Sequence, residues 1–200
     1  QIKTITKDYK LDCIKIGLIN SVSQAKVICK ILMKLKYKVP IVVDPIFKSS
    51  TNKEFNNSKN FILINEIISK INPVFTPNLN EAKTLLKLNY YKKIDTSEII
   101  KNFIKTYKAK VVITDGGHKN DYCEDYFVDE NEVVKKIMTR KIFTKNTHGS
   151  GCTFSSALAI NLAKGFTLGK SVELAKYFTK KCILNAPKFK LSYGPVGHLL

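Results

Sequence analysis

The segment from Asn146 to Cys152 carries residue types that bind and transfer charged groups. Gly149 and Gly151 stand one residue apart, immediately before an apolar stretch with helical spacing. The first N–H groups of a helix have no partner within the helix, so they point at whatever precedes it. An anion there gains about 0.3–1 kcal/mol from the helix dipole, and glycines let the backbone approach it closely. The pattern predicts an anion-binding turn, with an ordinary tight turn capped by Ser150 as the alternative.

Cys152 falls in the first turn of that helix. The helix dipole favours a thiolate, so the pKa of this thiol is expected to lie below its usual value. A thiolate could take a proton from an attacking hydroxyl group. The alternative is a small buried residue that packs the turn, since cysteine is often buried. The residue type alone favours neither interpretation.

Asp44, Asn78 and Glu81 could organise a magnesium ion. Magnesium prefers oxygen ligands and keeps several waters, so one or two carboxylates at strand ends are sufficient. Asn78 and Glu81 are three residues apart, on one face of a starting helix. The alternatives are a turn-forming Asp44-Pro45 pair and a Glu81 that only stabilises a helix N-terminus.

The run Asp115-Gly116-Gly117-His118 is expected to form a sharp turn after a strand, and its glycines could approach a nucleotide. His118 fits a surface turn, and the other two histidines are given no chemical role. The sequence has no G-x-x-x-x-G-K-[ST] P-loop and no strand-linked G-x-G-x-x-G motif. By motif, therefore, the chain is not a standard NTPase or dinucleotide-binding protein.

Strands and helices alternate along the chain, which predicts one α/β domain over residues 1–200 with a mainly parallel sheet. Short apolar runs indicate strands at 13–17, 40–45, 74–78 and 111–114. Apolar residues at helical spacing indicate helices at 21–35, 61–71, 80–88 and 95–107. Further on we expect an antiparallel pair at 126–128 and 132–137, a last short strand at 142–143, and helices at 151–163 and 171–184. Ligands gather at the carboxyl ends of parallel strands, which is where the polar residues above fall.

The composition disfavours several classes of protein. The formal net charge is +18, but Arg140 is the only arginine, and nucleic-acid grooves favour arginine for bidentate contacts. The lysines are spread along the chain and fit a solvated surface that could attract an anionic substrate. The five cysteines form no C-x-x-C pair, which predicts reduced thiols and a cytosolic location. No apolar run reaches membrane length, no signal peptide is visible, and the chain starts at Gln1.

These features together resemble one family, the hydroxymethylpyrimidine/phosphomethylpyrimidine kinases of thiamine biosynthesis, within the ribokinase-like superfamily. The matching stretches run through the whole chain: Ile14-Lys15-Ile16-Gly17-Leu18, Val43-Asp44-Pro45-Ile46, Thr76-Pro77-Asn78-Leu79-Asn80-Glu81-Ala82, Gly116-Gly117-His118, Thr144 to Thr153, and Gly194-Pro195-Val196. Cysteine after Gly-x-Gly is the specific part, because most superfamily members place aspartate there. The resemblance implies a three-layer αβα fold with a mainly parallel central sheet, here lacking the family's N-terminal strand–helix units.

The resemblance also implies a reaction. ATP would donate its γ-phosphoryl group to the hydroxymethyl group of the pyrimidine, and then to the resulting monophosphate. Cys152 matches the proposed base, and Gly149, Ser150 and Gly151 match the anion hole that steadies the transferring group.

Metal and nucleotide positions follow from the same resemblance. Asn78 and Glu81 match an N-x-x-E element that organises Mg²⁺, often through water, and Asp44 lies near the magnesium and the phosphates. The nucleotide lies near three further residues, Gly116, Gly117 and Thr147. The implied assembly is a cytoplasmic homodimer that binds small molecules and neither nucleic acid nor membrane.

Three departures from the family pattern leave alternatives open. The chain starts beyond a Gly-Ser-Asp-x-Ser-Gly-Gly-Ala-Gly-like stretch that helps to form the pyrimidine pocket, so the substrate-binding residues are unknown. Asp115 stands where the family usually has lysine, and Thr51-Asn52 stands where it has Ser-Gly. The alternatives are a pyridoxal kinase-like activity and a non-catalytic remnant that only binds nucleotide or a partner subunit. A nucleic-acid-binding module is a distant third.

Overall fold

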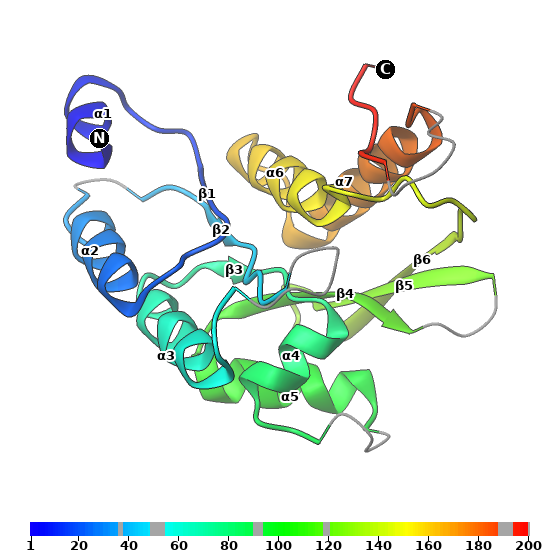
Figure 1. Ribbon diagram of the computed structural model, residues 1–200, viewed down its shortest axis with the longest axis horizontal. Helices are drawn as coiled ribbons and strands as arrows, with labels where there is room; N and C mark the ends of the chain where they lie inside the picture. The colour runs from blue at the N-terminus through cyan, green and yellow to red at the C-terminus, as the bar shows by residue number, and fades with distance from the viewer. Residues whose placement is uncertain (36–37, 49–54, 90–93, 118–120, 188–193, 200) are drawn as a thin grey trace.

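A six-stranded sheet runs through the centre of the computed structural model, with its strands side by side in sequence order (Figure 1). The structure describes residues 1–35, 38–48, 55–89, 94–117, 121–187 and 194–199. The first four strands are parallel, and the last two continue the sheet in antiparallel fashion. The strands are β1 (Ile14–Ile16), β2 (Ile41–Val43), β3 (Val74–Phe75), β4 (Lys110–Gly117), β5 (Tyr122–Val128) and β6 (Val134–Arg140).

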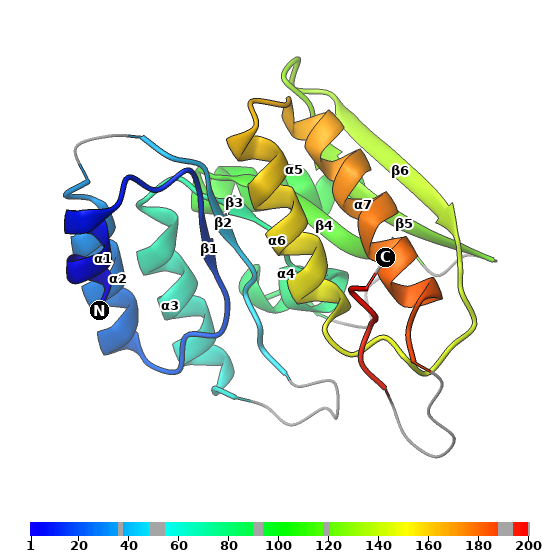
Figure 2. The same ribbon diagram turned by 90° about the horizontal axis from the view of Figure 1, so that it is seen from above.

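Helices cover both faces of the sheet, which gives the three-layer αβα arrangement expected from the sequence (Figures 1 and 2). One face carries α2 (Val22–Leu32), α3 (Ser58–Ser69), α4 (Leu79–Leu85) and α5 (Thr96–Tyr107). The other face carries α6 (Ser150–Ala163) and α7 (Leu168–Leu184). A short helix before the sheet, α1 (Ile2–Asp8), has no buried residue and was not expected from the sequence.

The central strands are apolar at every position because a hydrophobic core packs against each face of the sheet. Successive residues of a strand point to opposite faces, so Val42 packs under α6 and α7 while Val43 packs against the helices on the other face. Val74 and Phe75 divide in the same way. A strand buried on both faces needs apolar residues throughout, which is the pattern typical of parallel sheets.

Two sequence expectations about the sheet are wrong. Residues 142–143 form no strand, because the chain leaves the sheet after Arg140 and crosses toward α6 (Figure 1). Asp115-Gly116-Gly117 does not stop its strand in a sharp turn either, since β4 continues to Gly117. The glycines lie instead at an irregularity in the pairing of β4 with β5, where the register shifts between Ile113 and Gly117.

The fold brings the carboxyl ends of the parallel strands to the N-terminus of α6. Asp44 follows β2 directly, and Asn78 follows β3 as the first residue before α4. Asn78 also bridges to Thr114 in β4, which aligns these two strand ends. No helix among the described residues is long and apolar enough to cross a membrane.

Candidate active site

The turn before α6 begins with a glycine in a left-handed conformation. Gly149 is the N-cap residue with φ 85° and ψ 2°, a region that other residues enter at a cost of about 1–2 kcal/mol. No side chain caps the helix, so the alternative in which Ser150 acts as the cap is wrong: Ser150 is already the first helical residue. Within the described part of the chain, the N–H groups of Gly151 and Cys152 have no acceptor. These two groups are therefore free to bind an anion.

The C-terminal tail holds this turn in place. The His148 N–H donates to the carbonyl of Gly194 at 3.1 Å, and the Val196 N–H donates to the carbonyl of His148 at 3.1 Å. The His148 backbone thus contributes both hydrogen bonds between the tail and the turn. A side-chain hydrogen bond also links the C-terminal tail to α6, because His198 Nε2 lies 2.9 Å from Thr153 Oγ1.

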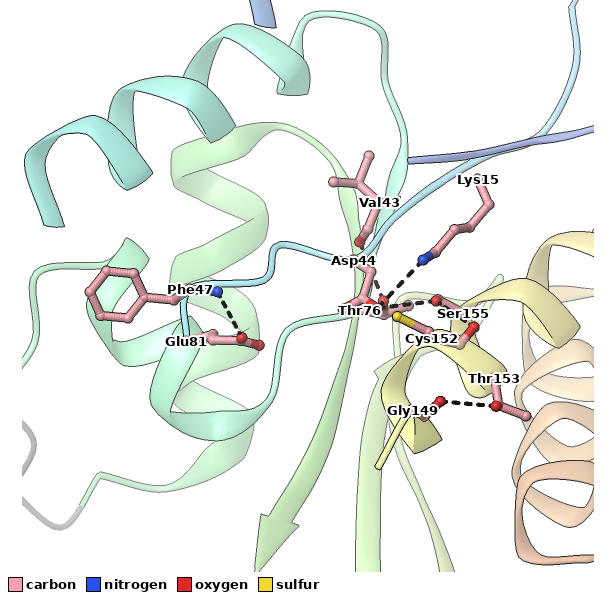
Figure 3. Close-up of polar contacts among 10 residues, drawn as sticks. All are labelled: Lys15, Val43, Asp44, Phe47, Thr76, Glu81, Gly149, Cys152, Thr153 and Ser155. Atoms are coloured by element: carbon pink, nitrogen blue, oxygen red, sulfur yellow. Dashed lines mark hydrogen bonds and ion pairs between the residues drawn. The ribbon is translucent and has the colours of Figure 1, made fainter. Parts of the chain in front are cut away.

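Cys152 lies beside the Asp44 carboxylate at the mouth of the turn (Figure 3). Its side chain is exposed, whereas Asp44 is only 7 % exposed. Ser155 Oγ donates to Asp44 Oδ2 at 3.3 Å, and Lys15 Nζ lies 3.8 Å from the same oxygen. Asp44 therefore joins β1, β2 and α6 through one carboxylate.

The pKa of the Cys152 thiol is raised above its usual value, so the expectation of a lowered pKa is wrong. Partial desolvation of the sulfur is the largest cause, and the neighbouring Asp44 carboxylate adds to it. The Lys15 ammonium opposes both effects but does not outweigh them. Burial also raises the pKa of Asp44, against the influence of Lys15 and Ser155. The thiol proton consequently stays on Cys152 at neutral pH in the free protein.

Asn78 and Glu81 form a reciprocal capping box at the start of α4. The Asn78 side chain accepts from the Glu81 N–H, and Glu81 Oε2 accepts from the Asn78 N–H, both at 2.9 Å. Glu81 Oε1 accepts a third bond, from the Phe47 N–H at 3.2 Å (Figure 3). The helix-stabilising role considered for Glu81 is thus present, and it fixes the carboxylate beside the loop that follows Asp44.

The charges around Asp44 and Glu81 fit a magnesium ion held partly through water. Burial raises the pKa of Glu81 to about 7, the two backbone N–H donors lower it, and the Asp44 carboxylate raises it further. Two acidic groups that repel each other would be relieved by a divalent cation. In the portion of the chain that the structure describes, no group of three His, Cys, Asp or Glu side chains could hold a metal. Magnesium here would therefore rely on water and on phosphate oxygens as well as on the protein.

A cavity of about 440 Å³ opens on the other side of the turn. Thr147, Ser150 and Gly151 line one end of it, and the side chains of Arg140 and Lys141 line another part of the wall. Asp115, at the end of β4, also lines this cavity. The turn before α6 therefore has Asp44 and Cys152 on one side and a cationic cavity on the other.

Comparison with known proteins decides the family. The phosphomethylpyrimidine kinase family profile matches residues 1–197. A hydroxymethylpyrimidine/phosphomethylpyrimidine kinase of Staphylococcus aureus is 32% identical over 204 residues, which cover 99% of this chain and 72% of that protein. The chain belongs to the phosphomethylpyrimidine kinase family. It is thus a member of a family of phosphotransferases with a ribokinase-like fold.

The chain is also similar to a longer plant enzyme and to a solved pyridoxal kinase. A probable thiamine biosynthetic bifunctional enzyme of rice is 28% identical over 98% of this chain, which spans only 36% of that longer protein. A pyridoxal kinase from Staphylococcus aureus, solved in complex with AMP-PCP and pyridoxal, superposes with a TM-score of 0.85 at 27% identity. That match covers 99% of this chain and 71% of the pyridoxal kinase.

Two of the residues predicted to lie near the nucleotide are not in the turn that the sequence analysis expected. Gly116 and Gly117 lie within β4 and not in a turn, although β4 does lead to the cavity through Asp115. Asp115 itself adopts a left-handed conformation with φ 54°. His118 and Thr51-Asn52 lie outside the described residues.

Sequence reasoning missed the polar neighbours that complete the site. Lys15 and Ser155 contact Asp44, and an ion pair between Asp125 and Lys176 lies in the cavity wall. A sequence signal existed for the pair, because Asp125 lies inside a strand and Lys176 lies on the buried face of α7 with Val172 and Ala175. That signal marks each residue as unusual but does not predict that the two form an ion pair.

The buried carboxyl of Glu81 predicts a stability that depends on pH. Its pKa of about 7 lies above the usual 4.5, so the folded protein binds the proton more tightly than the unfolded chain. The free energy of unfolding should therefore fall as pH rises from about 4.5 to about 7. Urea unfolding across this range, with a chelator present, measures the effect. Glu81→Gln should flatten the dependence and the exposed Glu98→Gln should not; equal slopes in all three proteins would contradict the assignment.

Proposed function

We propose that this chain is the ATP-binding and catalytic part of a magnesium-dependent kinase that phosphorylates hydroxymethylpyrimidine and then its monophosphate. One observation carries the proposal: the uncapped N-terminus of α6 lies between the Asp44–Cys152 pair and a cationic cavity. Membership of the phosphomethylpyrimidine kinase family supports the choice of substrate.

The cavity is the proposed nucleotide site. Its end at Thr147, Ser150 and Gly151 would receive the phosphates, because unpaired backbone N–H groups and the helix dipole favour negative charge there. Arg140 and Lys141 in the wall add positive charge. The AMP-PCP complex of the Staphylococcus aureus pyridoxal kinase supports an ATP-like ligand in a related fold.

The proposed chemistry places the acceptor alcohol on the Cys152 side of the turn. As the alcohol oxygen forms its bond to the γ-phosphorus, the bond from phosphorus to the ADP oxygen breaks and ADP leaves. The alcohol proton passes to the sulfur of Cys152 in its thiolate form. In the turn formed by Gly149, Ser150 and Gly151, the unpaired N–H groups of Gly151 and Cys152 hold the equatorial oxygens. Magnesium, when bound near Asp44 and Glu81, would neutralise charge on the phosphates.

Pyridoxal is the second candidate substrate. The observation that favours it is the close superposition on a pyridoxal kinase. Both substrates present a primary alcohol on an aromatic ring, so the same turn could serve either one. The discrimination depends on the acceptor pocket, for which the described residues provide little beyond the Cys152 side.

A direct comparison of substrates tests the proposal. Protein of the full natural length is incubated with Mg-ATP and hydroxymethylpyrimidine, its monophosphate or pyridoxal, and ADP release is measured alongside product mass. We expect kcat/KM for the pyrimidine to exceed that for pyridoxal at least tenfold. The reverse order would assign the pyridoxal activity, and no ADP release with any acceptor would support a non-catalytic remnant.

Two wider expectations belong to the same proposal. Cytoplasmic location is supported by the five unpaired cysteines. A homodimer is proposed on the family resemblance alone. Light scattering of the purified protein measures the oligomeric state directly.

A further inference from the structure

A buried ion pair lies in the wall of the cavity that the turn before α6 also lines. Lys176 Nζ, on α7, is 2.7 Å from Asp125 Oδ2, on β5, and the two side chains are only 8% and 7% exposed. The other oxygen of Asp125 accepts from the Asp115 N–H at 3.1 Å. Both Asp125 oxygens are thus occupied, whereas an ammonium group has three donors and Asp125 is the one partner shown for it among the described residues.

Stability is a weak reason for this pair to exist. Removing two charges from water costs several kcal/mol per ion, and apolar residues of similar size often replace such a pair without loss. The surrounding core on this face is apolar, with Phe154, Val172 and Ala175 close to the pair in the fold. The pair stands at the edge of that core, where it lines a cavity instead of filling the interior. Its location therefore indicates a role toward a ligand.

The charges of the cavity wall specify the class of that ligand. Four cationic side chains line the cavity against two carboxylates. The cationic residues are Arg140, Lys141, Lys176 and Lys180, and the acidic ones are Asp115 and Asp125. A wall with this excess of positive charge suits a polyanion. Asp115 places a carboxylate on the same wall as the turn residues, so phosphates bound there gain from a cation fixed on that wall.

Lys176 is in the position to supply that cation. The chain of contacts runs from the Asp115 N–H to Asp125 and from Asp125 to the Lys176 ammonium. Asp125 fixes the ammonium in the wall, so little side-chain entropy remains to be lost when a ligand binds. Lys180, one helical turn further along α7, lies on the same cavity but is less buried.

We propose that Lys176 is a ligand of the nucleotide phosphates and that Asp125 holds it in position. The proposal rests on the proposed function, because it takes the cavity as the site of the polyphosphate. It predicts that the energy of the contact depends on phosphate charge and not on the base.

The test must separate a ligand contact from a structural ion pair. Lys176→Met alone would leave Asp125 buried without a partner and could prevent folding. The double variant Lys176→Met/Asp125→Asn removes both charges and keeps an oxygen for the Asp115 N–H. Lys176→Gln is the second variant, because its amide still donates to Asp125. Lys181→Met, an exposed lysine of the same helix outside this cavity, is the matched control.

Calorimetry with Mg-ATP and with AMP, together with thermal unfolding, gives the result. We expect the double variant to unfold near the wild-type temperature but to bind Mg-ATP at least tenfold more weakly. Lys176→Gln should unfold at a lower temperature, because Asp125 keeps its charge without a cation, and should show the same loss of affinity while it is folded. Lys181→Met should bind within twofold of wild type, and the loss for AMP should be much smaller than for Mg-ATP. Wild-type affinity for Mg-ATP in folded Lys176 variants would overturn this proposal, whereas failure of the wild type itself to bind Mg-ATP would overturn the proposed function.

Discussion

Replacing Cys152 with alanine is expected to lower kcat by about 10²–10⁴-fold, the range typical of a lost general base. The side chain is exposed beside Asp44 at the start of α6, and alanine keeps the helix while removing the proton acceptor. Mg-ATP binding should stay within twofold of wild type, because the phosphates are held by backbone groups. Steady-state kinetics and calorimetry measure the two quantities. Near-wild-type kcat would remove Cys152 from the base role, and Cys13→Ala provides the control for a cysteine outside the site.

The raised pKa of Cys152 gives this prediction a second part. Because the thiolate is the proposed base and desolvation and Asp44 raise the pKa of the thiol, kcat should increase with pH through and above neutrality. Cys152→Asp supplies a carboxylate whose usual pKa is about 3.9. It should therefore retain measurable turnover and shift the rising limb of the pH profile to lower pH. An unchanged profile would show that another group titrates.

The fold follows from the sequence because its determinants are local. Val42-Val43 and Val74-Phe75 are apolar at every position, which only a strand buried on both faces requires. Asn78 and Glu81 form their capping box within four residues, so the spacing alone indicates it. The turn before α6 was located for the same reason, from Gly149 and Gly151.

The electrostatics of the site were not predictable in the same way. A thiol at a helix N-terminus is expected to ionise easily, yet the pKa of Cys152 is raised, first by partial desolvation of the sulfur and then by Asp44, which is far away in the sequence. The Asp125–Lys176 pair likewise joins a strand to a helix across the fold. The Asp115-Gly116-Gly117 segment was misjudged because strand pairing with β5 overrides the local preference of glycine for turns.

Gly151→Ala is expected to reduce kcat about 10²-fold without destabilising the protein. Gly151 is helical, and an added Cβ would lie 3.9 Å from Asp44 Oδ2, an ordinary contact. Alanine is favoured over glycine in helices by about 1 kcal/mol, so the unfolding temperature should stay the same or rise. The methyl group would nevertheless project toward Asp44, into the space where the proposed mechanism places the transferring phosphoryl group. A displacement of about 1 Å there costs about 10²-fold in rate.

Gly149→Ala provides the contrast that makes this result interpretable. Nothing lies within 4 Å of a Cβ at Gly149, but its φ of 85° strains any other residue, so that variant should lose about 1–2 kcal/mol of stability. Thermal unfolding and kinetics of both variants therefore separate the two uses of glycine in one turn: conformation at Gly149 and space for the phosphoryl group at Gly151. Turnover of Gly151→Ala within threefold of wild type would mean that the phosphoryl group does not pass between α6 and Asp44.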